Sequence, residues 1–429
     1  MKIPQTTDHL IKSVFIKLVL IVAIAFFSYS QIVLAQPIYN QELTFLAGGD
    51  VEWSRMARWN LFHRDIIRYP LKFESKQEEA RYPFIKIKSL LESADLTFAN
   101  LESPLSDKAK RVGAFLAPTS FTEGLKWSGI DVVSVANNHA LDAGVEGLKD
   151  TLNSLEQKNL PAIGGGENLD LARRPFIFKK NGVRLGFLAY TMSENSGDSS
   201  YAQQNRPGVM STDFSLIQED IQKLRQQVDY VILSFHWGLN NGEKPPFWVR
   251  HLAHKSIDAG ADIILGHHPH YPHGIEVYNG KPIIYSLGNF IFGHNHPIWT
   301  DNFLARLTLT PKEIKKIEIL PVAGENQDLA QPFLLDGERS RKLLEVVKQQ
   351  TLDLKTHMNI VGEIGVINPA TAQIPKTIFD DIIYDLLLPK QLWMLLAAIL
   401  SLGAVIWFVI SRFMRIRRRR RRKQKRFST

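Results

Sequence analysis

Asp262-Ile263-Ile264-Leu265-Gly266-His267-His268-Pro269-His270 joins a short apolar run to three closely spaced imidazoles. The apolar part is typical of a buried strand, and the histidines follow at the point where that strand is expected to end. Neutral imidazole is the commonest side-chain metal ligand, and a His-x-His pair at a strand end can direct two ring nitrogens at one point. The alternative is a surface loop that happens to be rich in histidine. The rest of the chain bears on that choice.

Short apolar runs alternate with amphipathic stretches from Leu43 to about Val322. We expect strands at Leu43–Ala47, Leu96–Ala99, Val132–Val135, Leu185–Ala189, Tyr230–Phe235, Asp262–Leu265, Ile283–Ser286 and Leu304–Leu309. We expect helices at Tyr82–Ser93, Val145–Gln157, Phe214–Gln227 and Trp248–Ala259. This alternation predicts an α/β (α+β) architecture with several parallel strands, whose ligands gather beyond the carboxyl ends of those strands. Residues 326–389 are more polar, and we expect a helical stalk or small lobe there, with its best helix at Ser340–Thr356.

Five of the expected strands end in a carboxylate, a carboxamide or an imidazole. The candidate metal ligands at these ends are Asp50, Glu102, Asn138, His236, His268 and His270. Together they are the hard and borderline ligands of a dinuclear hydrolytic site. Each also has an ordinary interpretation, as a turn residue, a helix cap or a core histidine, but all of these would have to hold at once. The absence of cysteine means that any metal is held by N and O ligands, which suits Zn, Mn, Fe, Mg or Ca. For this set of candidates we expect one or two divalent ions of Zn, Mn or Fe.

Several further polar residues accompany the candidate ligands. His139, with Asp142 three residues later, is a candidate proton donor oriented by a carboxylate. The candidates for substrate binding are Arg55, Asn100, His267 and Glu243. Arg55 and His267 suit an anionic group. Glu243 is equally well explained as a solvated loop charge.

Two apolar segments indicate an exported, anchored protein. Residues 1–35 have the pattern of a signal peptide ending at Ala35, with an uncleaved N-terminal anchor as the alternative. Residues 391–411 carry no charge and are long enough to span a hydrocarbon core of about 30 Å. The basic tail 412–429 follows, and the positive-inside rule places it in the cytoplasm and residues 43–325 outside.

The net charge of +9 comes from this tail, which holds eleven Lys or Arg between 412 and 426. The rest of the chain has a net charge of −2. The tail therefore fits membrane lipid headgroups, and nothing in the charge pattern predicts a nucleic-acid partner.

The strand-end motifs resemble a known family. The matching stretches are Gly49-Asp50 with Arg55, 99–105, 136–142, 236–238, 257–270 and 285–290. They look like the bacterial capsule synthesis protein family called CapA, or poly-γ-glutamate biosynthesis protein PgsA, within the calcineurin-like metallophosphatase superfamily. The likeness covers about residues 43–325. In the superfamily's first motif, Asp-x-His, the third position is Glu52 here, and Asn100 and Glu102 stand where Gly-Asp-x-x-Asp is usual.

The resemblance implies a four-layer sandwich, with two central mixed sheets between helices and a metal site at the strand ends. It also implies a role in synthesis, export or anchoring of poly-γ-glutamate capsule or a related anionic envelope polymer. A metal-dependent hydrolase or transferase is the first hypothesis. A non-catalytic membrane partner of capsule synthase or export subunits is the second, and a periplasmic metal-dependent phosphoesterase is the third.

Overall fold

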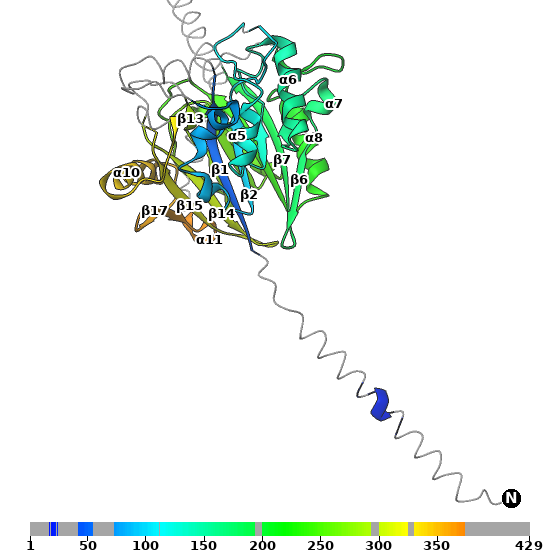
Figure 1. Ribbon diagram of the computed structural model, residues 1–429. Coiled ribbons are helices and arrows are strands. Elements are labelled where there is room, and N and C mark those ends of the chain that lie inside the picture. Colours follow the sequence, from blue (N-terminus) through cyan, green and yellow to red (C-terminus); the bar gives the residue numbers. More distant parts are fainter. Residues whose placement is uncertain are drawn as a thin grey trace, which may run out of the picture. The chain divides into compact units, whose positions relative to one another are not determined.

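The computed structural model describes residues 42–54, 73–110, 112–193, 200–292, 300–324 and 330–373, with a few more between 17 and 24. Contacts divide the chain into a unit that ends at Gln373 and a second, Ile374–Thr429, which lies outside the described residues. The first unit is built on two large β-sheets (Figure 1).

The larger sheet contains nine of the described strands and is mixed. Its strands, in spatial order, are β16 (Asn359–Val361), β17 (Ile364–Ile367), β15 (Ile314–Val322), β14 (Asn302–Leu309), β1 (Leu43–Glu52), β2 (Leu96–Leu101), β3 (Val132–Ser134) and β4 (Ala162–Ile163), with β13 (Asn289–Phe292) also paired to β1. From β1 to β4 the strands are parallel, and from β14 to β16 they are antiparallel. The carboxyl ends of β1, β2 and β3 therefore meet at one edge.

The second sheet contains six of the described strands. Its order is β11 (Ile275–Tyr278), β12 (Lys281–Ile284), β10 (Ile263–His267), β9 (Tyr230–Gly238), β7 (Val183–Ser193) and β6 (Phe176–Lys180). The four inner strands are parallel and the two edge strands are antiparallel to their neighbours. A small pair, β5 (Gly165–Gly166) and β8 (Gly208–Val209), stands apart from both sheets.

The two sheets pack face to face over one apolar core. Phe45 and Phe98 from the larger sheet meet Phe187 and Leu265 from the smaller one, and Phe98 stacks on Phe187 with ring centroids 6.3 Å apart. The strands that line this core are buried on both faces, so they are near-continuous apolar runs without clean alternation.

Helices cover the outer faces of both sheets. On the larger sheet lie α3 (Lys76–Arg81), η1 (Tyr82–Phe84), α4 (Lys88–Leu91), α5 (Phe121–Trp127) and α6 (Gly144–Gln157), and on the smaller sheet lie α7 (Leu169–Ala172), α8 (Phe214–Arg225) and α9 (Phe247–Asp258). The expected four layers with two mixed sheets at the centre are therefore present in the described residues.

For 326–389 we expected a helical stalk or small lobe, and the described part, residues 330–373, contains strands as well as helices. Helix α10 (Gly337–Asp353) is close to the expected helix, but its residues Leu343, Leu344 and Val347 are buried in the core between the sheets. Strands β16 and β17 then extend the larger sheet, and α11 (Pro369–Ala372) follows. Up to Gln373 this segment is thus part of the main unit, because its apolar residues close one end of the sandwich.

The strands and helices given above do not include the predicted membrane segments. The spanning segment 391–411, the basic tail 412–429 and most of 1–35 lie outside the described residues. Within the part of the chain that is described, no helix is both long enough and apolar enough to cross a membrane.

Candidate metal centre

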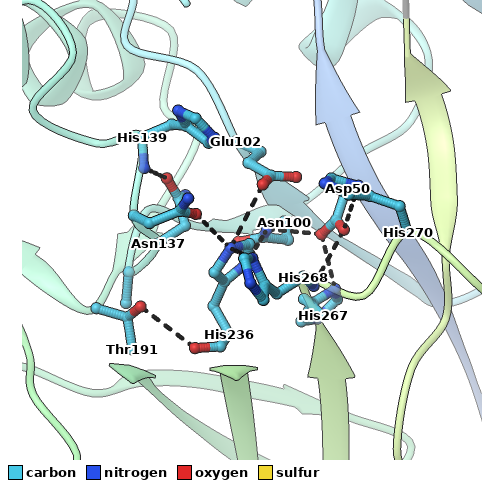
Figure 2. A network of polar contacts seen from close by, with 12 residues as sticks. Asp50, Asn100, Glu102, Asn137, His139, Thr191, His236, His267, His268 and His270 are labelled. Carbon is cyan, nitrogen blue, oxygen red and sulfur yellow. Dashed lines mark hydrogen bonds and ion pairs between the residues drawn. The ribbon is translucent and has the colours of Figure 1, made fainter. Parts of the chain in front are cut away.

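Polar side chains from both sheets converge at the carboxyl ends of the inner strands (Figure 2). Asp50 lies near the end of β1, Asn100 lies in β2 and Glu102 directly follows it. His236 lies in β9, opposite His267 of β10 in the register of the smaller sheet. The loops after β3 and β10 add the remaining residues, Asn138, His139, His268 and His270.

Short contacts join the members of this cluster across the two sheets. The Nδ2 of Asn100 donates to Asp50 Oδ1 at 2.8 Å and lies 3.2 Å from His236 Nδ1. On the other side of the ring, His236 Nε2 lies 2.7 Å from Asn138 Oδ1, 3.2 Å from His268 Nδ1 and 3.4 Å from Glu102 Oε1. The candidate ligand atoms of five strand ends therefore lie within a few ångströms of one another.

The loop after β10 reaches the cluster through an unusual backbone. His268 and His270 have φ angles of 96° and 62°, a region that non-glycine residues rarely adopt and that costs about 1–3 kcal/mol each. In this conformation His268 N donates to Asp50 Oδ2 at 3.2 Å, and His270 Nδ1 lies 3.8 Å from the same oxygen. Backbone strain at two successive candidate ligands is typical of a functional site.

Gly49 lets β1 approach the neighbouring chain closely enough to place Asp50. A Cβ at this position would lie 1.9 Å from the carbonyl oxygen of Gly288, and Asp50 N donates to that same oxygen at 3.0 Å. Any larger residue would displace the strand end that carries Asp50. The Gly-Asp pair therefore has a packing reason as well as a chemical one.

Glu102 is a buried acid of the cluster without hydrogen bonds. Its side chain is fully buried, yet neither carboxylate oxygen has a hydrogen-bond partner. Burial, followed by the negative charges of Asp50 and Glu52, raises the pKa of Glu102 well above its usual range. His268 Nε2 is likewise buried without a partner. Buried polar atoms are normally hydrogen-bonded, so these atoms fit ligands of a cation.

Two overlapping groups of ligand atoms are compatible with metal ions. One group is Glu102, His236 and His268, and the other is Asp50, Glu102 and His270. In each, the ligand atoms lie within 4.8 Å of one another. Glu102 belongs to both groups, so it would be a ligand whichever of the two held an ion. The donor set is N and O only, which suits divalent Zn, Mn or Fe and leaves the ion unidentified.

The ionisation of the cluster favours ligands ready to bind a cation. Burial would raise the pKa of Asp50, but its hydrogen bond and charge interaction with His267, together with His236 and His270, hold that pKa well below the usual range. Burial, and then the neighbouring imidazole of His268, lowers the pKa of His236. Burial and the charge of His270 lower the pKa of His268 to about 3. At neutral pH Asp50 is therefore ionised, and His236 and His268 are neutral.

A second pair lies at the rim of the cluster. His139 Nδ1 is 2.8 Å from Asp142 Oδ2, and both side chains are partly exposed, unlike the cluster below them. His139 is close enough to the cluster to affect the ionisation of His236 and His268 electrostatically. With Nδ1 bonded to a carboxylate, Nε2 is left to hold or give a proton at the rim.

All six candidate ligands and the His139–Asp142 pair come together. Of the four candidates for substrate binding, two lie inside the cluster, one lies elsewhere and one is outside the described residues. Asn100 is fully buried inside the cluster, where it bonds to Asp50, so it is inaccessible to a substrate. His267 is also fully buried, with Nδ1 3.3 Å from Asp50 Oδ1 and its ring against Phe98. Glu243 lines a separate cavity with Tyr271 and Lys342. Arg55 lies outside the described residues.

Three residues that the motifs did not single out support the site. Asn289 Oδ1 is 2.8 Å from His270 Nδ1 and orients that ring, as outer partners of ligating histidines do. Asn137 donates to the carbonyl of Leu101 at 2.8 Å and accepts from His139 N at 3.1 Å, which fixes the loop after β3. Phe115 packs on His139 with ring centroids 4.2 Å apart. The Asn side chains stood inside quoted motifs, whereas nothing in the sequence near Phe115 indicated its contact.

This geometry defines a class of protein: a two-sheet sandwich with a buried cluster of N and O ligands suited to divalent metal. The family model described as "Bacterial capsule synthesis protein PGA_cap" matches residues 44–294, which is more than half of the chain. The chain therefore belongs to the bacterial capsule synthesis protein family, as the strand-end motifs predicted. The matched region includes every described member of the cluster.

Two curated relatives have names that refer to PGA or capsule biosynthesis. The chain is 34% identical over 254 residues to "PGA biosynthesis protein CapA" of Bacillus subtilis (strain 168), covering 58% of this chain and 66% of that protein. It is 29% identical over 294 residues to "Capsule biosynthesis protein CapA" of Bacillus anthracis, covering 66% of this chain and 68% of that protein. The chain thus spans just under two thirds of the first relative's length.

Among solved structures, the chain is similar to the calcineurin-like phosphoesterase YfkN from Bacillus subtilis. The sequence identity is 14%, the TM-score is 0.34, and the match covers 73% of this chain and 97% of that one.

Proposed function

We propose that this protein acts in the synthesis, export or anchoring of poly-γ-glutamate capsule, or of a related anionic envelope polymer, as a metal-dependent hydrolase or transferase. One observation carries the enzymatic part of the proposal. Glu102, a fully buried acid whose oxygens have no hydrogen-bond partner, lies 3.4 Å from the imidazole of His236, in the same cluster as the partly exposed His139–Asp142 pair (Figure 2). A merely structural core would not leave a buried acid without hydrogen bonds beside two other acids.

The residues divide into two roles. Asp50, Glu102, Asn138, His236, His268 and His270 would hold one or two divalent ions, which supply Lewis acidity and an activated water at neutral pH. Above them, Asp142 holds His139 Nδ1, so His139 Nε2 is free to protonate the leaving group. His267 and Asn100 keep Asp50 in place from below. The scissile bond would be an amide or a phosphoester at the rim.

The predicted membrane segments complete the proposal. A signal peptide or N-terminal anchor at 1–35 and a spanning segment at 391–411 would place the capsule-synthesis domain outside the cytoplasm. The basic tail 412–429 would face cytoplasmic lipid headgroups. There the protein could meet both the polymer and subunits of a capsule synthase or export complex.

A non-catalytic partner of such a complex is the second candidate function. It is favoured by Glu52, which stands where the superfamily's first motif has a histidine ligand and which raises the pKa of Glu102 through its charge. In that case the cluster would serve structure or binding. A phosphoesterase is the third candidate and differs from the first only in the bond that is cleaved.

The test uses the full chain purified from membranes, with metal content measured by elemental analysis. Activity is assayed on γ-glutamyl, other amide and phosphoester substrates. We expect stoichiometric divalent metal and hydrolysis or transfer on one substrate class. A His139→Gln variant should keep its metal and lose about 10²- to 10⁴-fold in kcat, the usual contribution of a positioned proton donor.

The matched control is His251→Gln, which removes an exposed histidine of α9 and should change neither metal content nor rate. A His139→Gln protein with full activity would remove the proton-donor role. Stoichiometric metal without turnover on any substrate class would favour the non-catalytic candidate. Turnover of phosphoesters alone would favour the third.

A further inference from the structure

A short loop, residues 112–115, holds Asp142 through three backbone N–H groups. Val112 N and Gly113 N donate to the Asp142 carbonyl oxygen at 2.6 and 2.8 Å, and Phe115 N donates to Asp142 Oδ2 at 2.8 Å. The loop and Asp142 are 27 residues apart in sequence at the last of these contacts. This loop therefore fixes both the backbone and the carboxylate of the residue that bonds His139.

Phe115 also contacts the imidazole itself. Its ring centroid lies 4.2 Å from that of His139 at an interplanar angle of 47°, and its side chain is buried. His139 is thus held on two sides, by the Asp142 carboxylate at Nδ1 and by the Phe115 ring on its face. Two contacts on different sides of a ring leave it little rotational freedom.

An aromatic bridge joins this loop to the metal centre. Phe115 meets Phe292 edge-on with centroids 5.8 Å apart, and Phe292 meets His270 with centroids 5.0 Å apart. Phe115 and Phe292 form a separate apolar cluster of their own. Through these packed rings, the bridge connects the His139–Asp142 pair to the loop after β10 that carries His270.

Gly113 leaves no space between the loop and Asp142. A Cβ at this position would lie 2.1 Å from Asp142 Oδ1 and 2.3 Å from its Cγ, so any side chain would push the carboxylate away. Val112 beside it is 76% exposed and its side chain lies at the surface. A side chain added at Gly113 would therefore displace the Asp142 carboxylate, whereas shortening the exposed side chain of Val112 would not.

We infer that the loop 112–115 is a positioning element for His139, which fixes the imidazole over the metal centre through Asp142 and through the Phe115–Phe292 bridge. Its catalytic consequence rests on the proposed function, but the geometry it imposes on His139 does not. Gly113 and Phe115 are positioning residues, because they act on the substrate only through His139.

The experiment compares Gly113→Ala, Phe115→Leu and Val112→Ala in the full-length protein. The first readout is the low-field NMR signal of the hydrogen-bonded His139 Nδ1–H, assigned by its loss in His139→Gln. We expect Gly113→Ala to lose this signal, because its new methyl group displaces Asp142. Phe115→Leu keeps the backbone donor, so it should retain the signal but broaden it. Val112→Ala should leave the signal unchanged.

The second readout is kinetic. Gly113→Ala should lower kcat by about 100-fold with little change in KM, as a misplaced catalytic group does, and more strongly for poor leaving groups. Phe115→Leu should lower kcat by about 10-fold, which is less than the loss expected for Gly113→Ala. If both variants keep the NMR signal sharp and unshifted, the inference is overturned whatever the activity. If the wild type turns over no substrate but Gly113→Ala loses the signal, the positioning role stands and the proposed catalytic function fails.

Discussion

Two buried histidine–glutamate contacts in the described residues differ, because one is a hydrogen bond and the other is not. On the outer side of the smaller sheet, His254 Nε2 lies 3.0 Å from Glu276 Oε2, which also accepts from the Tyr285 hydroxyl at 2.6 Å. At the strand ends, His236 Nε2 lies 3.4 Å from Glu102 Oε1, and neither Glu102 oxygen has a hydrogen-bond partner. The two glutamates are similarly buried, so exposure does not separate them.

The ionisation of the two glutamates goes in opposite directions. Burial would raise the pKa of Glu276, but the hydrogen bond and charge of His254 lower it below the usual value. Burial raises the pKa of Glu102, and the charges of Asp50 and Glu52 raise it further. A buried His–Glu contact is therefore not a functional site by itself. Clustered like charges and unpaired ligand atoms distinguish the candidate metal centre from an ordinary core pair.

The largest expected contrast is in metal binding. Glu102→Gln should lower the affinity for divalent metal by more than about 100-fold, since even outer partners of metal ligands contribute 10- to 100-fold. Glu276→Gln, the same substitution in the satisfied pair, should leave metal content unchanged. Elemental analysis and competition with a chelator measure both. Equal metal content in the two variants would contradict the assignment of Glu102.

A third buried imidazole extends the comparison to pH. His273 has no carboxylate partner among its described contacts, bonds the Gly242 carbonyl at 2.7 Å, and has a pKa lowered to about 4 by burial. Between pH 6.5 and 4 the unfolded chain binds a proton at this site and the folded one does not. Stability from this group is therefore full above about pH 6.5 and is lost as pH falls to 4, by about 3 kcal/mol.

His273→Gln keeps a donor for the carbonyl but cannot titrate. Its free energy of unfolding, measured by denaturant titration with chelator present, should fall less steeply between pH 6.5 and 4 than that of the wild type. His251→Gln, at an exposed position, should follow the wild-type curve. Parallel curves for wild type and His273→Gln would show that His273 titrates normally in the folded protein.

The smallest contrast is in stability without metal. Glu102→Gln removes a buried acid that has no hydrogen bond, so in chelated protein it should raise the free energy of unfolding by about 1 kcal/mol. Glu276→Gln breaks bonds to a charged group and should lower it by about 1–3 kcal/mol. Urea unfolding of the two metal-free variants checks the opposite signs. A loss of stability in Glu102→Gln would indicate that Glu102 is a structural residue.

Much of the candidate site could be predicted because its members stand at strand ends. The order Asp50, Glu102, Asn138, His236, His268 follows the chain, and parallel strands place their carboxyl ends at the same edge. Roles within a motif were harder to assign. His267 and His268 are adjacent, yet strand alternation points His267 inward under Asp50, while the positive φ at His268 turns the next residues toward the cluster. Asn100 was expected to meet substrate and is instead buried beside Asp50.

The sequence by itself determined the layered α/β fold, the ligand types, the family and the expectation of a membrane anchor, because these depend on local periodicity, residue chemistry and spacing. Only the tertiary structure decided which buried acid lacks hydrogen bonds, that residues 330–373 complete the sandwich, and that a loop 27 residues before Asp142 holds the carboxylate beside His139, the candidate proton donor. Those properties arise where the two sheets and their loops meet. Burial and like charge act there between residues that no local pattern connects.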